Sequence, residues 1–253
     1  MKRLLSISLL TLAFACREQT VTTTATETSV TETSATETTV TETTTSSSAP
    51  PPTAPEPPAA PVAKGPKLMP VDEASKDPSL VAFRDELLAA VRKRDADAVV
   101  ALADPKIRTS FGGGGGAAGL KRNLGQPGVW EDFERLLTQG GAFQGESFWA
   151  PYVYSSWPDA HDAFTSLAIT SENVPLRESA DANAPVVATL SYDIVQRAGD
   201  VGRDPGAWQN VKTSDGRTGW VESRFVRSPV GYRAGFLKNK EGKWRMNALV
   251  AGD

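Results

Sequence analysis

Cysteine and histidine, the two residue types that most often act as nucleophile, base or metal ligand, occur once each in this chain of 253 residues, as Cys16 and His161. Nucleophilic catalysis and zinc coordination both need a histidine beside a second specific group. His161 instead lies between Asp159 and Asp162 in the polar segment PDAHDAF, which is typical of an exposed loop. The sequence therefore predicts no catalytic residue, no metal site and no cofactor.

Carboxylates are the other groups that could do chemistry, because a glycosidase needs two of them at a fixed separation. The candidates by residue type are Glu131, Glu134, Glu146, Asp159 and Asp162. Spacing in sequence does not select two of these, and a solvated surface explains them more simply. A carboxylate-dependent cell-wall hydrolase stays as an alternative, and it predicts a buried acid with a raised pKa near Trp149 or Trp157.

A dense run of aromatic residues lies among these acids in the chain. Its members are Phe143, Phe148, Trp149, Tyr152, Tyr154 and Trp157. Exposed rings of this kind stack on sugars, whereas buried rings fill a core. We expect most of the run to be buried, with Tyr154 and Trp157 the more exposed pair.

The glycine run FGGGGGAAG, at residues 111–119, contains the spacing GxGxxG that lets a backbone approach a dinucleotide. Such a match is almost automatic in a glycine run, and no lysine followed by serine or threonine closes it. We expect a turn here.

Nucleic-acid binding is also disfavoured, because 27 basic residues against 30 acidic ones leave a net charge of −3.

The elements that position these groups begin with a basic start, Lys2 and Arg3, and an apolar run over residues 4–14. This run is shorter than the roughly 20 residues that span a bilayer and has the length of a signal-peptide core. The segment LAFAC, which ends at Cys16, resembles the lipobox of bacterial lipoproteins. The resemblance implies that residues 1–15 are a signal peptide and that Cys16 is lipidated.

Arg17 follows the cysteine where some lipoproteins carry aspartate, which by the same resemblance implies an outer-membrane anchor facing the periplasm. An ordinary secretory signal, cleaved after Ala15, is the alternative.

The composition of residues 16–66 predicts a linker, first rich in threonine and glutamate and then rich in proline. Few large apolar side chains oppose the entropy of the chain there, so we expect it to be disordered.

An α+β fold is expected beyond the linker, with an α-rich domain at 67–160 and a β domain at 161–253. Helical spacing predicts two helices within 79–102 and a third over 129–139. Short apolar runs separated by DG and EG predict strands from about residue 164 onward, ending in a hairpin with Phe236 and Trp244 beside its turn. The helix pair and this hairpin resemble the two ends of nuclear transport factor two like domains, which would make the strands between them an insertion.

The strings NVPLRESADANAPVVATL and WQNVKTSDGRTGWVESRFV, within residues 170–227, resemble a bacterial Src homology 3 (SH3) type domain. The resemblance implies a small β-barrel. It places residues 176–177 in its first strand, 186–190 in its second and 208–211 in its fourth, with a type I′ turn at Asp215 and Gly216 in the last hairpin.

The SH3 resemblance also implies a binding function for an exported, tethered protein. We expect a non-catalytic envelope module that recognises peptidoglycan or an envelope protein through aromatic stacking and a few polar contacts. A protein-interaction scaffold without glycan affinity is the other binding alternative. The candidate ligand-binding residues are Trp208, Trp220, Arg177 and Asp215.

Overall fold

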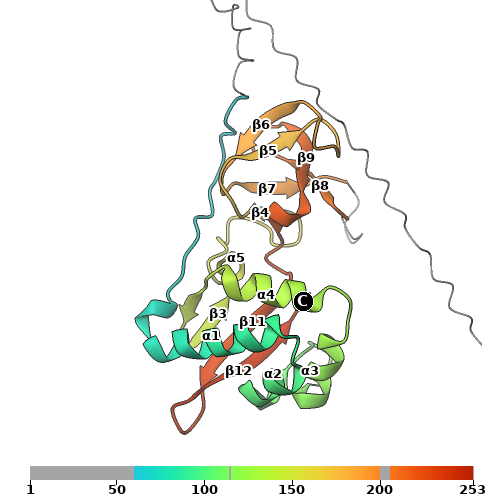
Figure 1. The fold of residues 1–253 in the computed structure, drawn as a ribbon. Coiled ribbons are helices and arrows are strands. Elements are labelled where there is room, and N and C mark those ends of the chain that lie inside the picture. The colour runs from blue at the N-terminus through green and yellow to red at the C-terminus, as the bar shows by residue number, and fades with distance from the viewer. Residues whose placement is uncertain (1–59, 114, 200–205, 253) are drawn as a thin grey trace, which may run out of the picture. The chain divides into compact units, whose positions relative to one another are not determined.

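The computed structural model describes residues 60–113, 115–199 and 206–252. The predicted signal peptide, Cys16 and the linker as far as residue 59 lie outside the described residues. The part that is described is a mixed fold of five α-helices and twelve strands in two sheets (Figure 1). Within it, no helix is both long enough and apolar enough to cross a membrane.

The first sheet has five strands. Their order is β1 (Ala103–Arg108), β12 (Trp244–Val250), β11 (Arg233–Lys238), β3 (Ser147–Ala150) and β2 (Ala142–Gln144). The terminal hairpin β11–β12 is central in this order, although its sequence position groups it with the second half of the chain. The second-sheet strands are therefore inserted, in sequence, between β3 and β11.

Five helices accompany the first sheet: α1 (Pro78–Arg92), α2 (Ala96–Leu102), α3 (Gly116–Leu124), α4 (Val129–Thr138) and α5 (Tyr152–Ser155). Helices α1 and α4 lie side by side across one face of the sheet (Figure 1). The three predicted helices are confirmed as α1, α2 and α4, and α3 begins at Gly116, within the run 111–119 that was expected to be a turn. Asp77 and Asp95 cap α1 and α2 by accepting backbone N–H bonds from Ser79 and Ala98.

The core between these helices and the first sheet is rich in aromatic rings. Phe83 of α1 contacts Phe236 edge to face, with ring centroids 5.9 Å apart, and Phe236 also contacts Phe148 at 6.2 Å. Phe133 of α4 is fully buried in the same core. Phe236 therefore contacts a ring of α1 and a ring of the neighbouring strand β3.

The second sheet has seven strands, all between residues 166 and 227. Their order is β10 (Val226–Arg227), β4 (Ser166–Ile169), β7 (Ile194–Arg197), β8 (Trp208–Lys212), β9 (Thr218–Glu222), β5 (Val174–Arg177) and β6 (Val186–Leu190). Two 3-10 helices complete the described elements, Ala74–Lys76 and Ser223–Phe225. Strand positions predicted from the SH3 resemblance are confirmed for β5, β6 and β8.

The predicted barrel is not closed, because the end strands β10 and β6 are not hydrogen-bonded to each other. Residues 61–63 occupy the edge of β6 instead: Ala63 N–H donates to the Thr189 carbonyl at 3.0 Å, and Thr189 N–H donates to the Pro61 carbonyl at 3.0 Å. Ala63 is only 4% exposed and belongs to the core of this sheet. The linker prediction is therefore wrong for residues 61–66, which pair with the sheet.

The β8–β9 hairpin has a three-residue loop rather than the predicted type I′ turn. Thr213 N–H donates to the Arg217 carbonyl at 2.8 Å, Gly216 N–H donates to the Thr213 carbonyl at 3.0 Å, and only Gly216 has a positive φ, of 90°. A type I′ turn needs positive φ at both central residues. Of the Asp-Gly pair, only Gly216 therefore has a left-handed backbone, as the last residue of a loop that is one residue longer than a type I′ turn.

Candidate functional site

The outer face of the second sheet brings together three of the four predicted ligand-binding residues. Trp220 of β9 lies opposite Arg177 of β5 on one side and opposite Asn210 of β8 on the other. Trp208 is two residues before Asn210 and therefore lies on the same face of β8. We call Arg177, Asn210, Trp208 and Trp220 the SH3 outer face.

Neither tryptophan belongs to the core of this sheet. Their strand neighbours Val211 and Val221 are fully buried, whereas Trp208 and Trp220 are half-buried. Alternation of side chains along a strand explains this, because residues of one parity face the core and the others face away. The indole rings therefore remain available on the surface.

Arg177 is held by the loop that follows its own strand. Its guanidinium donates to the Ala184 carbonyl at 2.7 Å, and its Nε has no partner among the described residues. This bond fixes the orientation of the cation beside Trp220. A ligand carboxylate at this position would meet a positioned donor.

Asp215 is not on the SH3 outer face. It lies in the β8–β9 loop, where its carboxylate accepts a 2.5 Å hydrogen bond from the Thr213 hydroxyl and pairs with Arg217 at 3.5 Å. The Thr213 hydrogen bond is the main cause that lowers the pKa of Asp215. Its contacts in the described structure are those of a loop-stabilising residue.

Two residues that sequence reasoning missed lie beside the predicted ones. Asn210 lies between the two tryptophans, with its side-chain Oδ1 buried and unpartnered within the described structure. Glu222 lies opposite Trp208 and pairs with Arg224 at 2.7 Å. Alternation from Trp208 along β8 and from Trp220 along β9 could have indicated both residues.

Residues 172–227 match the family model of the bacterial SH3 domain, which covers β5 to β10 and includes the whole SH3 outer face. This part of the chain is a bacterial SH3 domain. Domains of this type bind peptidoglycan or proteins. No curated protein sequence matches the chain.

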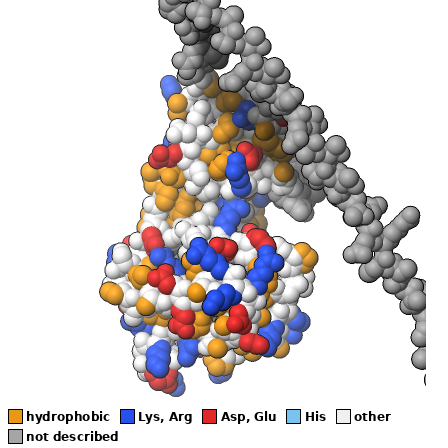
Figure 2. Space-filling view, viewed as in Figure 1, with side chains coloured by type: hydrophobic (Ala, Val, Ile, Leu, Met, Phe, Trp, Pro, Cys, Tyr) orange, Lys and Arg blue, Asp and Glu red, His pale blue; other side chains and the backbone are white. Residues whose placement is uncertain are grey.

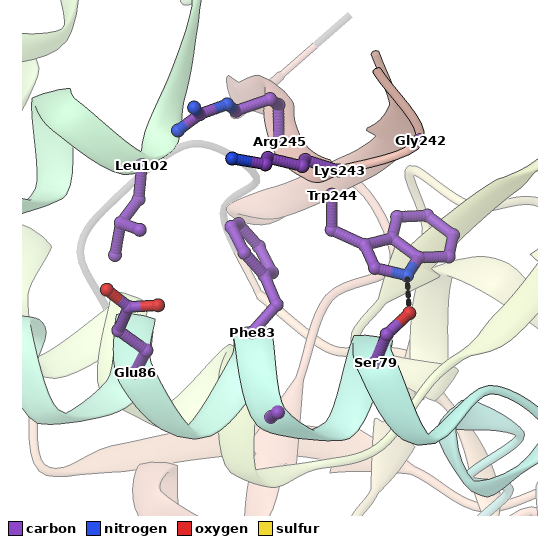
Figure 3. A pocket seen from close by; sticks show the side chains of 9 residues that line it. Ser79, Phe83, Glu86, Leu102, Gly242, Lys243, Trp244 and Arg245 are labelled. Atoms are coloured by element: carbon purple, nitrogen blue, oxygen red, sulfur yellow. Dashed lines mark hydrogen bonds between the residues drawn. The ribbon is translucent and has the colours of Figure 1, made fainter. Parts of the chain in front are cut away.

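Outside the SH3 domain, one cavity of about 460 Å³ lies between α1 and the start of β12 (Figure 3). Lys243 and Arg245 extend in the same direction, and Glu86 of α1 lies across the cavity from them. Trp244 is 6% exposed and its Nε1–H donates to the Ser79 hydroxyl at 3.1 Å, so its ring is a wall of the core. Arg245 donates to the Ala101 carbonyl at 2.8 Å, which ties it to α2.

The aromatic run is divided among the first core, which contains Phe148, a separate small cluster, which contains Tyr152, and a second cavity. Phe148 and Tyr152 are buried, and burial raises the pKa of Tyr152 to about 12. Tyr154 and Trp157 are half-buried and, with Phe164, line a cavity of about 370 Å³ that we call the aromatic pocket. The expectation that most of the run is buried is wrong, because only Phe148 and Tyr152 are buried, and Phe143 and Trp149 are half-buried like Tyr154 and Trp157.

The candidate carboxylates are dispersed. Glu131 and Glu134 of α4 pair with Arg94 and Arg92, and Figure 2 shows charged side chains of both signs intermixed over the helices on this face. Asp162 accepts backbone N–H bonds from Phe164 and Thr165, so it shapes its own loop. Asp159 is exposed at the aromatic pocket, which is lined by one carboxylate.

Proposed function

We propose that this protein is a cell-envelope lipoprotein, anchored by lipid on Cys16, whose SH3 domain binds a ligand of the wall or envelope without catalysing a reaction. The SH3 outer face is the observation that carries the binding proposal. Two half-buried tryptophans beside a positioned arginine offer stacking surface and a charge-assisted hydrogen bond. Peptidoglycan suits this surface because its stem peptides carry carboxylates and its location matches a protein anchored in the envelope.

A binding role is supported over hydrolysis by the carboxylates of the described residues. Glycoside hydrolysis uses two acids that flank the scissile bond. The aromatic pocket presents Asp159 alone, and the Asp162 carboxylate accepts two backbone N–H bonds. A wall ligand at this pocket would therefore be held rather than cleaved.

Co-sedimentation of the full chain with purified peptidoglycan tests the binding proposal. We expect binding that persists from low to moderate salt, because stacking is not screened as exposed charge is. Trp220→Ala removes one stacking ring, and it should lower the bound fraction severalfold. Trp130→Ala is the matched control, since it removes a half-buried tryptophan outside the SH3 domain.

A circular dichroism melt of each variant separates lost binding from lost folding. Equal pelleting of the wild type and the Trp220→Ala variant would remove the SH3 outer face as the site. No pelleting of the wild type would favour the scaffold alternative, in which the SH3 domain binds an envelope protein. Crosslinking in intact cells, with capture that depends on Trp220, would then identify that function.

Fractionation of cells tests the anchor. We expect the wild type in the membrane fraction and the Cys16→Ala variant in the soluble fraction, because several buried acyl chains give nearly permanent anchoring. A matched variant, Arg17→Ala, keeps the acceptor thiol and should stay with membranes. Wild-type protein in the soluble fraction, with a thiol that reacts with maleimide, would support the secretory-signal alternative.

A further inference from the structure

The aromatic pocket is built by helix α5, by the loop between α5 and β4, and by the first residue of β11. Tyr154 comes from α5, Trp157 and Phe164 come from the loop between α5 and β4, and Arg233 begins β11. The cavity of about 370 Å³ falls within the range of roughly 300–1,000 Å³ that is common for small-ligand sites. Phe164 is 52% exposed, although it is a large hydrophobic residue.

The walls of this pocket are held in place before any ligand arrives. The Trp157 indole donates to the His161 carbonyl at 2.8 Å, which closes the loop on itself. The Tyr154 ring contacts the Trp149 ring, with centroids 5.3 Å apart, and the Arg233 guanidinium, 4.8 Å from its centroid. Fixed rings lower the entropy cost of binding, because little side-chain freedom remains to be lost.

Arg233 places a buried positive charge at this pocket. The residue is only 5% exposed, and no carboxylate lies within ion-pair distance of it among the described residues. Its guanidinium donates to the Gly252 carbonyl at 2.9 Å and more weakly to the carbonyls of Val230 and Gly231. Asp159, exposed and without a described ion-pair partner, also lines the pocket. The pocket thus combines aromatic faces with one guanidinium, one carboxylate and the polar side chains of Gln144 and Ser155.

We propose that the aromatic pocket binds an N-acetylated sugar of a glycan strand, as a second site distinct from the SH3 outer face. The apolar face of a sugar ring stacks on Phe164 and Trp157, and its hydroxyls bond Asp159 and Gln144. Ala163, Pro229 and Val230 line the same cavity and provide an apolar contact for the acetamido methyl group. This inference rests on the proposed function, because it takes the ligand from the wall.

Calorimetric titration of the full chain with a soluble N-acetylglucosamine tetramer tests the proposal. We expect binding that weakens about tenfold in Phe164→Ala, the loss of one stacked ring. Phe111→Ala is the matched control: it is 46% exposed and contacts Arg233, but it does not line the pocket. Its affinity, and that of Trp220→Ala, should equal the wild type.

Two results would overturn the sugar site: no binding of the tetramer at millimolar concentration, or equal affinity of Phe164→Ala and the wild type. The co-sedimentation experiment with Trp220→Ala keeps this outcome separate from the SH3 proposal. Loss of the sugar site alone would leave Trp220-dependent pelleting intact. If tetramer binding requires Phe164 but the Trp220→Ala variant pellets like the wild type, the aromatic pocket is the sugar site and the SH3 outer face is not a binding site.

Discussion

The two sheets of this protein use their aromatic residues in opposite ways. The core beside the first sheet contains phenylalanine and tryptophan side chains, including Phe83, Phe133, Phe148 and Phe236. The fully buried core of the SH3-containing sheet contains aliphatic side chains, such as Leu176, Val211 and Val221, and no aromatic ring among its described buried members. Its two tryptophans are half-buried on the outer face.

This difference shows where each region's stability and surface chemistry come from. Burying an aromatic side chain stabilises a fold strongly because its area is large. A sheet that leaves its tryptophans outside forgoes part of that stabilisation and keeps the rings available for a ligand. The SH3 domain compensates partly with the residues at 61–68, which pair along its edge.

The comparison predicts its largest effect in the first core. Phe148→Ala should lower the free energy of unfolding by about 3–5 kcal/mol, because the ring is fully buried and contacts both Phe143 and Phe236. Denaturant titration measures this change. A loss below about 1 kcal/mol would contradict the difference drawn between the two sheets, because the stability of the first core would then not depend on its aromatic rings.

The second largest effect on stability is expected where residues 61–68 pair with the second sheet. Asp193 is 2% exposed and accepts from Lys67 Nζ at 2.8 Å and from Ser191 N–H at 2.7 Å. Asp193→Ala leaves the part-buried Ser191 N–H without its acceptor, so we expect a loss of about 1–3 kcal/mol in denaturant titration. Glu222→Ala, which breaks the exposed pair with Arg224, is the control and should cost about 0–1 kcal/mol.

A smaller effect on stability is expected at the SH3 outer face. Trp220→Ala should lower the free energy of unfolding by about 1 kcal/mol, because the ring is only half-buried. The same denaturant titration measures it. A loss as large as that of Phe148→Ala would show that Trp220 acts as a core residue, and the contrast between the two sheets would fail.

The smallest effect at neutral pH concerns Asp77, which joins α1 to β11. A hydrogen-bonded ion pair with Lys238, at 2.7 Å, is the main cause that lowers its pKa, and Ser79 adds to it. A lowered folded-state pKa contributes stability that is present above the ordinary value near 3.8 and is lost as pH falls through the lower value. Asp77→Asn should therefore reduce the drop in melting temperature between pH 7 and about pH 3. An unchanged drop would assign the acid sensitivity to other carboxylates.

Much of the local structure could be predicted from patterns in the chain. Helical spacing predicted α1, α2 and α4, and the strings around Leu176, Trp208 and Trp220 predicted the SH3 strands. Helix α3 was missed because its glycines have poor helix propensity. The structure supplies a reason for one glycine just before it: a side chain at Gly115 would lie 2.4 Å from the Ile107 carbonyl of β1.

The sequence by itself determined the element types, the alternation that turns Trp208 and Trp220 to one face, and the family of residues 172–227. Such information is local, because propensity and side-chain period act within a few residues. Only the tertiary structure decided that residues 61–63 take the edge of β6, that the terminal hairpin joins the first sheet, and that Tyr154, Phe164 and Arg233 line one pocket. Pairings between residues far apart in the chain depend on which strand edges and apolar surfaces remain unpaired after the local elements form. A local sequence pattern does not contain that information.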